Sequence, residues 1–482
     1  MDAANTDSSP STAVGATHPD LPLESHIPLA RWQLVDKLLA EGRLSAAQQN
    51  QFRQFAEIFA AYQHFRYHHS LETLKRLYQP LNPDADTVAK GAEAPPGARD
   101  TSVEQRHHLE QLLGAARYVP LTAADLRAAV ERAGIVALRT EVDTDDFKNW
   151  RLFGRGLRHQ DVPRKKWGFW PSRETQPVYE RLVLAVWFKS AEAMAARGRQ
   201  LKKLPFIPGK CYLYLYKDIP KYDLEILFPN LRVRMAPWDQ WLLVIPALGA
   251  MVALAAKVLP HLLLIAAALV VLVAGQRGLS WLGLDDIPMA GLFPVIAAAL
   301  TLSMTLGGFA ARQYGNYQKK RLTYLKRIAD TLFFRSLATN ESVVYALVDE
   351  AEEAAVKEAL LVYYHLITSE EPLTAAALDA RVETWLHEEL GVAVDFDIDD
   401  VLHKLRAIES PALARQWHRY ECALLTQDPE GFCRPLALEE ANHLLDYLWD
   451  HLFLHANGQG EALAWDPGDV EVQGSGARAA PH

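Results

Sequence analysis

Residues 242–274 read LLVIPALGAMVALAAKVLPHLLLIAAALVVLVA, and residues 289–311 read MAGLFPVIAAALTLSMTLGGFAA. A helix needs about 20 mostly apolar residues to cross the roughly 30 Å hydrocarbon core of a bilayer. The second block has the length of one crossing, whereas the 33 residues of the first block exceed it. Lys257, Pro260 and His261 interrupt the first block, which favours a kink or a return to the interface there.

Basic residues flank the two apolar blocks, whereas the loop between them, residues 275–288, holds the single cation Arg277. Because positively charged loops stay cytoplasmic, we expect both large flanks on the same side of the membrane. The sequence therefore predicts a transmembrane hairpin over residues 237–311, with three short crossings as the alternative. This predicts an integral membrane protein of the bacterial inner membrane, with both large parts in the cytoplasm.

The segment after the second block, residues 312–340, has the pattern of a basic amphipathic helix. Its cations are Arg312, Lys319, Lys320, Arg321, Lys326 and Arg327. Beside a bilayer, each Lys or Arg contributes about 1 kcal/mol toward anionic lipid. We therefore predict the membrane and anionic lipid head groups as partners, and an ordinary solvated helix face is the alternative.

Composition and periodicity divide the chain into eight segments and predict an α+β membrane protein. The segments are a disordered tail (1–26), N-terminal helices (27–82), a linker (83–101), an α+β domain (102–236), the transmembrane hairpin (237–311), the basic helix (312–340), an acidic, mostly helical domain (341–455) and a second disordered tail (456–482). Three cysteines without metal-ligand spacing fit a reducing compartment.

Two amphipathic helices are predicted near the N-terminus. Leu29, Trp32, Val35 and Leu39 mark the first, and Ser45 is the predicted cap of the second. The apolar stripe of the second helix consists of Phe52, Phe55, Phe59 and Tyr62. His64 and His68 lie four residues apart on it, a spacing that suits a metal ion but lacks a third ligand, so a solvated face is the simpler interpretation.

The α+β domain carries the best candidates for polar chemistry. Strands are predicted over 135–141, 150–157, 178–189 and 211–217, and Thr122 is predicted to cap a helix that runs to Arg132. The candidate polar cluster is Arg155, Lys217, Asp218, Asp223 and Glu225. Acid–base or metal chemistry is one interpretation. The other is structural: Pro220 starts a helical turn whose carboxylates lie near the positive end of its dipole.

The runs PVYERLVLAVWFK (177–189) and LPFIPGKCYLYLYKDIPKYDLEILFPNLRVRM (204–235), followed at once by the apolar blocks, resemble the domain of unknown function 3754. The chain also resembles the transmembrane protein 143 family. The resemblance implies two membrane spans and no established activity, and it assigns no catalytic residue. It further implies a winged-helix-like arrangement for the C-terminal helices.

The C-terminal domain is predicted to hold helices over 342–367, 374–390, 397–408 and 437–454, with a strand pair over 417–425. Residues 341–455 contain 24 acidic and 7 basic residues, a net charge of −17. A domain of this charge repels phosphate, so nucleic acid is not an expected partner. DFDIDD (395–400) is interpreted as an acidic helix cap, because Asp400 and Arg406 stand where a calcium loop needs Gly and Glu.

The chain contains no Walker P-loop and no GxSxG, HExxH or GxGxxG motif, so no enzyme class and no cofactor or metal is predicted. The favoured function is a membrane-anchored scaffold or regulator whose acidic domain binds a protein partner. The alternative is a lipid-handling or other membrane enzyme that uses the polar cluster around Asp223.

Overall fold

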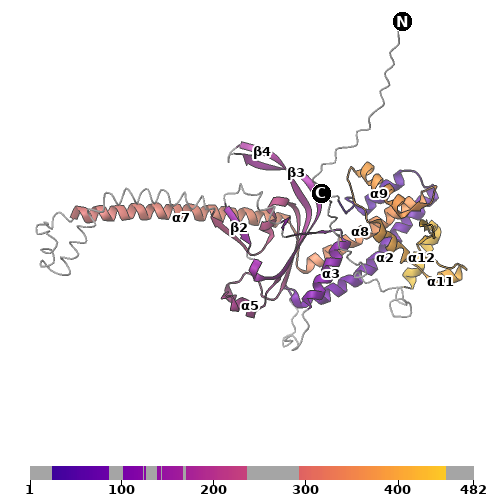
Figure 1. The fold of residues 1–482 in the computed structure, drawn as a ribbon, viewed down its shortest axis with the longest axis horizontal. Coiled ribbons are helices and arrows are strands. Elements are labelled where there is room, and N and C mark those ends of the chain that lie inside the picture. Colours follow the sequence, from indigo (N-terminus) through magenta and orange to yellow (C-terminus); the bar gives the residue numbers. More distant parts are fainter. Residues whose placement is uncertain are drawn as a thin grey trace, which may run out of the picture. The chain divides into compact units, whose positions relative to one another are not determined.

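The computed structural model describes residues 24–85, 101–122, 124–125, 138–142, 144–166, 170–235 and 293–451 (Figure 1). The chain divides into two compact units. The first unit combines residues 1–123, 146–221 and 336–482, and the second combines residues 124–145 and 222–335. Each unit therefore joins stretches that are far apart in the sequence.

The first unit combines helices with a large antiparallel sheet of strand order β1-β3-β4-β5-β7 and a small sheet of order β8-β10-β9. The helices are α1 (Arg31–Ala40), α2 (Ala46–Tyr78), α3 (Ser102–Ala115), α5 (Ala191–Ala196), α8 (Glu341–Ile367), α9 (Ala375–Leu390), α10 (Ile398–Arg406), α11 (Pro411–Gln416) and α12 (Leu438–Asp450), with the 3-10 turns η1 (Gln79–Leu81) and η3 (Leu201–Lys203). The strands are β1 (Val119–Leu121), β3 (Phe147–Lys166), β4 (Trp170–Phe188), β5 (Cys211–Pro220), β7 (Ser336–Thr339), β8 (Leu373–Thr374), β9 (Leu425–Gln427) and β10 (Phe432–Pro435).

The long helices α2 and α8 pack against each other (Figure 1). A capping box starts α2: the Gln48 N–H donates to Ser45 Oγ, and the Ser45 N–H donates to Gln48 Oε1. The rings of Phe55 on α2 and Tyr363 on α8 are stacked with centroids 4.3 Å apart. The predicted Ser45 cap and the predicted aromatic stripe of α2 are therefore confirmed.

The α8 helix contributes to both hydrophobic cores of the first unit. Its first half packs with the large sheet, where Val343 and Leu347 share a core with Leu213 and Val183. Its second half shares a core with α1, α2, α9, α10 and α12. A single helix thus links the sheet to the C-terminal helices.

Residues 24–30 form a segment that contacts both α8 and the stretch between α9 and α10. Glu24 forms a parallel bridge with Val394, and its carbonyl accepts a 2.8 Å hydrogen bond from the Asp395 N–H. The buried Lys357 of α8 donates to the carbonyls of Ile27 and Leu29 at 2.9 and 2.8 Å. We call residues 24–30 the N-terminal strap.

The C-terminal region has helices α8, α9, α10 and α11 before the β9–β10 hairpin, and β8 pairs with β10. The winged-helix-like arrangement stays a prediction. Thr374 caps α9, Gly391 ends it with φ +65°, and Asp397 caps α10. The predicted acidic cap at DFDIDD is therefore confirmed. The strand pair predicted over 417–425 is wrong in position, because the hairpin spans residues 425–435 and turns at Gly431 with φ +86°.

In the second unit, β2 (Leu138–Val142) pairs antiparallel with β6 (Leu231–Met235). The 3-10 turn η4 (Lys221–Leu227) follows Pro220, as predicted, and buries Leu224 and Leu227. The 3-10 turn η2 (Thr144–Asp146) precedes β3, and α7 (Phe293–Arg335) is a continuous helix of 43 residues. Most of the helix predicted after Thr122 lies outside the described residues.

The predicted transmembrane hairpin over residues 237–311 is contradicted. Among the described residues, no helix combines the length and the apolar character that a bilayer crossing needs. In α7 the second apolar block is interspersed with Thr301, Ser303 and Thr305 and runs on into basic sequence. The first block, residues 242–274, lies outside the described residues. The predictions of a membrane protein and of an inner-membrane location are corrected on this finding, whereas the α+β content is observed.

Candidate functional site

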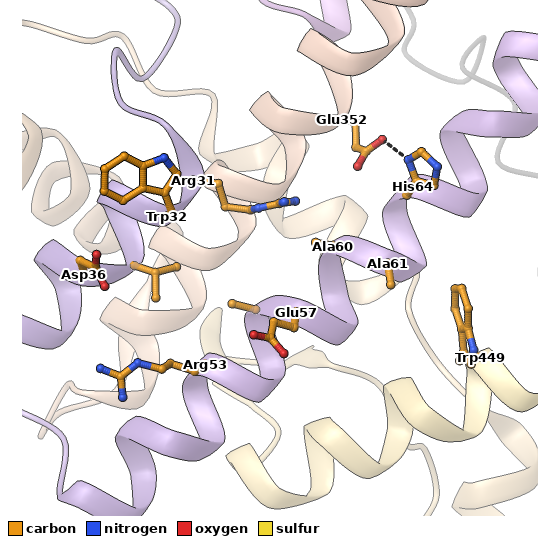
Figure 2. A pocket seen from close by; sticks show the side chains of 12 residues that line it. Arg31, Trp32, Asp36, Arg53, Glu57, Ala60, Ala61, His64, Glu352 and Trp449 are labelled. Carbon is orange, nitrogen blue, oxygen red and sulfur yellow. Dashed lines mark hydrogen bonds and ion pairs between the residues drawn. The ribbon is translucent and has the colours of Figure 1, made fainter.

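An open pocket of about 660 Å³ lies in the first unit, lined by α1, α2, α8 and α12 (Figure 2). Its floor is one face of α2, because the lining residues of that helix follow one another at alternating spacings of three and one. These residues are Arg53, Ala56, Glu57, Ala60, Ala61 and His64. We call this pocket the α2 groove.

Two exposed tryptophans flank the α2 groove. Trp32 of α1 is 66% exposed and Trp449 of α12 is 45% exposed. Three alanines lie on the floor, so the backbone of α2 is covered only by methyl groups there. Exposed indole rings beside an open, partly apolar depression are typical of interaction sites, where tryptophan is a frequent energetic anchor.

Side chains of both charge signs line the groove. At one end, His64 Nδ1 lies 2.8 Å from Glu352 Oε2, and the Glu352 side chain is only 14% exposed (Figure 2). In the part of the chain that the structure describes, the side chains of Arg31, Asp36, Arg53 and Glu57 have no ion pair. Two cations and two carboxylates therefore face the groove without mutual neutralisation.

The chemically reactive side chains of the groove are one histidine and three carboxylates. A histidine oriented by a carboxylate can act as a general base, and the pair of His64 and Glu352 has that form. However, the residues that line the pocket include no Ser, Thr, Cys, Tyr or Lys to serve as a nucleophile. The described residues, among them His64 and His68, also contain no group of three or more His, Cys, Asp and Glu side chains suited to a metal ion.

The two cations of the predicted polar cluster, Arg155 and Lys217, lie in one row across the large sheet. Arg155 on β3 lies opposite Arg181 on β4, which lies opposite Lys217 on β5, so the three cations form a row on one face of the sheet. Arg155 is held by Glu350 of α8 at 3.3 Å and stacks over the Tyr118 ring at 4.8 Å. Sequence reasoning missed Arg181, the central member, because strand register is not visible in the sequence.

The three carboxylates of the predicted cluster are divided between the two units. Asp218, in the left-handed conformation at φ +53°, pairs with Arg158 at 2.6 Å. Asp223 and Glu225 lie in η4, which belongs almost entirely to the second unit. In the first unit, the cation row is contacted by Glu350 of α8, whereas Asp218 is paired with Arg158.

The six predicted lipid-facing cations all lie on α7. Those whose side chains are described, Arg312, Lys319, Arg321 and Lys326, are exposed. Contact with anionic lipid head groups stays a prediction.

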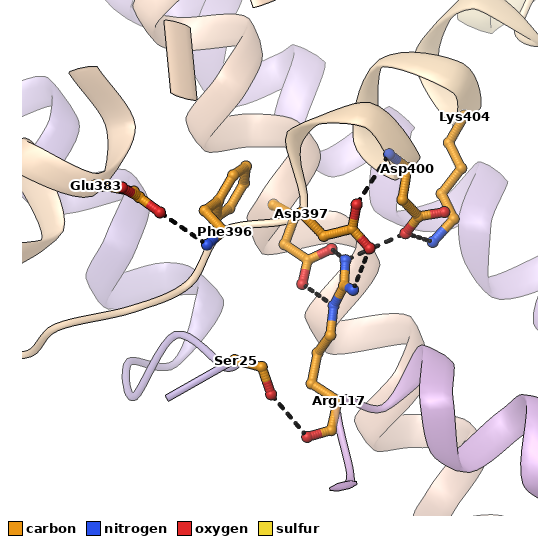
Figure 3. A network of polar contacts seen from close by, with 8 residues as sticks. Ser25, Arg117, Glu383, Phe396, Asp397, Asp400 and Lys404 are labelled. Carbon is orange, nitrogen blue, oxygen red and sulfur yellow. Dashed lines mark hydrogen bonds and ion pairs between the residues drawn. The ribbon is translucent and has the colours of Figure 1, made fainter. Parts of the chain in front are cut away.

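A buried arginine ties α3 to α8 and to the N-terminus of α10 (Figure 3). Arg117 has φ +61° and donates two hydrogen bonds of 2.7 Å to Glu358. It also donates to Asp397 at 3.2 Å and to Asp400 at 3.1 Å. Burial by itself lowers the pKa of Arg117, but the carboxylates of Glu358, Asp400 and Asp397 outweigh this and raise the pKa.

This network bears on what α10 can bind. In helix-turn-helix proteins, the N-terminal residues of the second helix contact base edges. In this chain the N-terminus of α10 carries acidic residues and is engaged by Arg117. Such an end offers carboxylates, not the cations that phosphate contacts require.

The α2 groove is not evident from the sequence. The spacing of Leu29, Trp32, Val35 and Leu39 predicts Trp32 on the apolar face of its helix, whereas α1 buries Leu34, Val35, Leu38 and Leu39 and exposes Trp32. Those four residues form a complete i, i+1, i+4, i+5 stripe, which was the available signal that Trp32 lies outside the core.

Residues 179–342 match the model of a family described as "Protein of unknown function (DUF3754)". The chain thus carries this domain of unknown function from β4 to the first turn of α8, as the resemblance implied. The match does not confirm the narrower resemblance to the transmembrane protein 143 family. No solved structure matches the chain. The residues that line the α2 groove all lie outside the matched range.

Proposed function

We propose that this chain is a protein-interaction scaffold or regulator that binds a segment of a partner protein in the α2 groove. The observation that supports this most is the exposure of Trp32 and Trp449 on two sides of one open pocket. Their indole rings cost free energy in water, and a partner that covers them recovers about 25 cal/mol per Å² of buried apolar surface. The groove includes α8 and α12 of the acidic region, for which a protein partner is predicted.

Site-specific crosslinking in the full chain tests this proposal. A photoreactive phenylalanine analogue replaces Trp32 or Trp449 in separate variants and replaces Tyr420, which is fully exposed between α11 and β9, as the control. We expect one and the same protein to be crosslinked from both groove positions and not from position 420.

Binding of that purified protein is then measured by calorimetry. Trp32→Ala and Trp449→Ala should each weaken it at least tenfold, whereas Tyr420→Ala should leave it unchanged. Equal crosslinking from all three positions, or binding that is indifferent to both groove substitutions, would contradict the proposal.

A further inference from the structure

We infer that the segment bound in the α2 groove is an amphipathic α-helix of the partner protein, oriented by carboxylates that meet Arg31 and Arg53. This inference rests on the proposed function and adds the conformation and the charge pattern of the ligand.

The walls of the groove favour a helix over an extended peptide. Every lining residue belongs to a helix, in which most backbone groups are used in the helix's own hydrogen bonds, and in the first turn of α1 the Arg31 N–H donates to Glu353. An extended segment would therefore find no sheet edge to bond to, and its own N–H and C=O groups would be left unpaired where water is excluded. A helix satisfies these groups internally, so it can be bound through side chains alone.

The floor of the groove is long enough to contact about three turns of a bound helix. From Arg53 to His64 it spans 11 residue steps along α2, or about 16 Å at about 1.5 Å per residue, which equals three helical turns. Ala56, Ala60 and Ala61 keep this floor low and allow a second helix to approach closely. Val35 and the two tryptophans then meet the apolar face of the bound helix at its sides.

Charge sets the pattern of the bound helix. Figure 2 shows the Arg31 side chain extending over the groove from α1, and Arg53 and Glu57 lie one turn apart on the floor. Since these groups and Asp36 have no ion pair among the described residues, a ligand with carboxylates opposite the arginines and cations opposite the acids neutralises all four. We therefore expect apolar residues at i, i+3, i+4 and i+7, flanked by Glu or Asp and by Lys or Arg.

Two copies of the chain do not fit groove to groove, because two concave surfaces leave a void between them, whereas a single helix is convex and fits one groove.

The test uses a display library of 18-residue peptides with this apolar spacing and with randomised flanking positions. Peptides are selected on the full chain after removal of those that bind the Trp32→Ala/Trp449→Ala double variant. We expect the selected peptides to gain helical circular dichroism on binding, and to bind at least tenfold more weakly when a central residue is replaced by proline.

Charge reversal provides the second readout. Arg53→Glu should weaken the selected peptides about fivefold or more, and replacing a peptide Glu by Lys should restore binding to that variant. Lys37→Glu, on the same unit but away from the groove lining, is the matched control and should have no effect.

Selected peptides that tolerate the central proline, or that bind Arg53→Glu as well as the natural chain, would overturn the helix inference. A crosslinked partner that depends on Trp32 and Trp449 while the library yields no helical binder would also overturn it and leave the proposed function standing. If neither partner nor peptide depends on the tryptophans, both conclusions fail.

Discussion

The Arg117 guanidinium and the Glu358 carboxylate form two parallel hydrogen bonds of 2.7 Å, with side chains that are 12% and 5% exposed. Bidentate geometry of this kind gives the strongest ion pairs in proteins. The pair fixes the end of α3 to the middle of α8. Because both groups are buried, neither tolerates the loss of its partner.

Arg117→Asn should lower the free energy of unfolding by about 3–5 kcal/mol, since it leaves a buried carboxylate uncompensated. Asparagine is chosen because it tolerates the positive φ at this position. Arg151→Asn is the control: Arg151 and its partner Glu110 are 42% and 35% exposed, and loss of this pair should cost less than about 1 kcal/mol. Urea unfolding measures both, and equal losses would contradict the assigned role of Arg117.

His365 should make the protein sensitive to mild acid. Burial, with smaller contributions from Arg381 and Arg43, lowers its pKa from 6.5 to about 3. Between these values the unfolded chain binds a proton that the folded protein does not. The contribution of His365 to stability is therefore complete above pH 6.5 and is lost as the pH falls toward 3, by up to about 1.4 kcal/mol per pH unit.

His365→Leu should flatten this decline. Neither ring nitrogen has a hydrogen-bond partner among the described residues, so the apolar replacement should cost little at pH 7. Asp379 titrates in the opposite sense: burial and then Glu383 and Asp395 raise its pKa to about 6, so its contribution is lost as the pH rises. Asp379 is present in both the natural chain and His365→Leu, so the difference between their free energies of unfolding from pH 5 to 7 reports the histidine alone. Free energies of unfolding that change with pH in parallel would contradict the role assigned to His365.

Gly156 should be nearly irreplaceable. Its φ is +69°, and a Cβ atom there would lie 2.7 Å from the Cβ of Glu180. Gly156→Ala should therefore destabilise the protein by about 2–4 kcal/mol, through backbone strain and steric overlap together. Gly42→Ala is the control for backbone strain without steric overlap, because Gly42 has φ +71° and open space around it. This substitution should cost about 1 kcal/mol. Thermal unfolding compares them, and equal shifts would show that the contact with Glu180 is unimportant.

Lys357→Met should release the N-terminal strap. The ammonium group holds the carbonyls of Ile27 and Leu29, and burial lowers its pKa. Without it we expect trypsin to cleave after Arg31 at least several times faster, while the helical circular dichroism is kept. Lys37→Met, which removes an exposed ion pair with Glu389, should leave cleavage unchanged. Resistance of the Lys357 variant to trypsin would mean that other contacts secure the strap.

Local signals in the sequence identified most elements of the first unit. Ser45, Thr374, Gly391 and Asp397 stand at helix ends as cap chemistry predicts, and the aromatic spacing on α2 gave its buried face. These features depend on neighbours within a few residues.

Long-range features could not be obtained in this way. The α2 groove gathers residues from positions 31 to 449, and the cation row depends on the register of three strands. The transmembrane prediction went wrong because apolar content over residues 289–311 was taken as sufficient, whereas the described helix α7 does not meet the requirements of a span.

The wide separation of α2 and α8 in the chain also has a consequence for biosynthesis. About 300 residues lie between Phe55 and its stacking partner Tyr363. At translation rates of about 5–20 residues per second, the phenylalanine stripe of α2 leaves the ribosome roughly 15–60 s before α8 exists to cover it. We expect the nascent chain to need a chaperone during this interval, and its yield to fall when translation is slowed between the two helices.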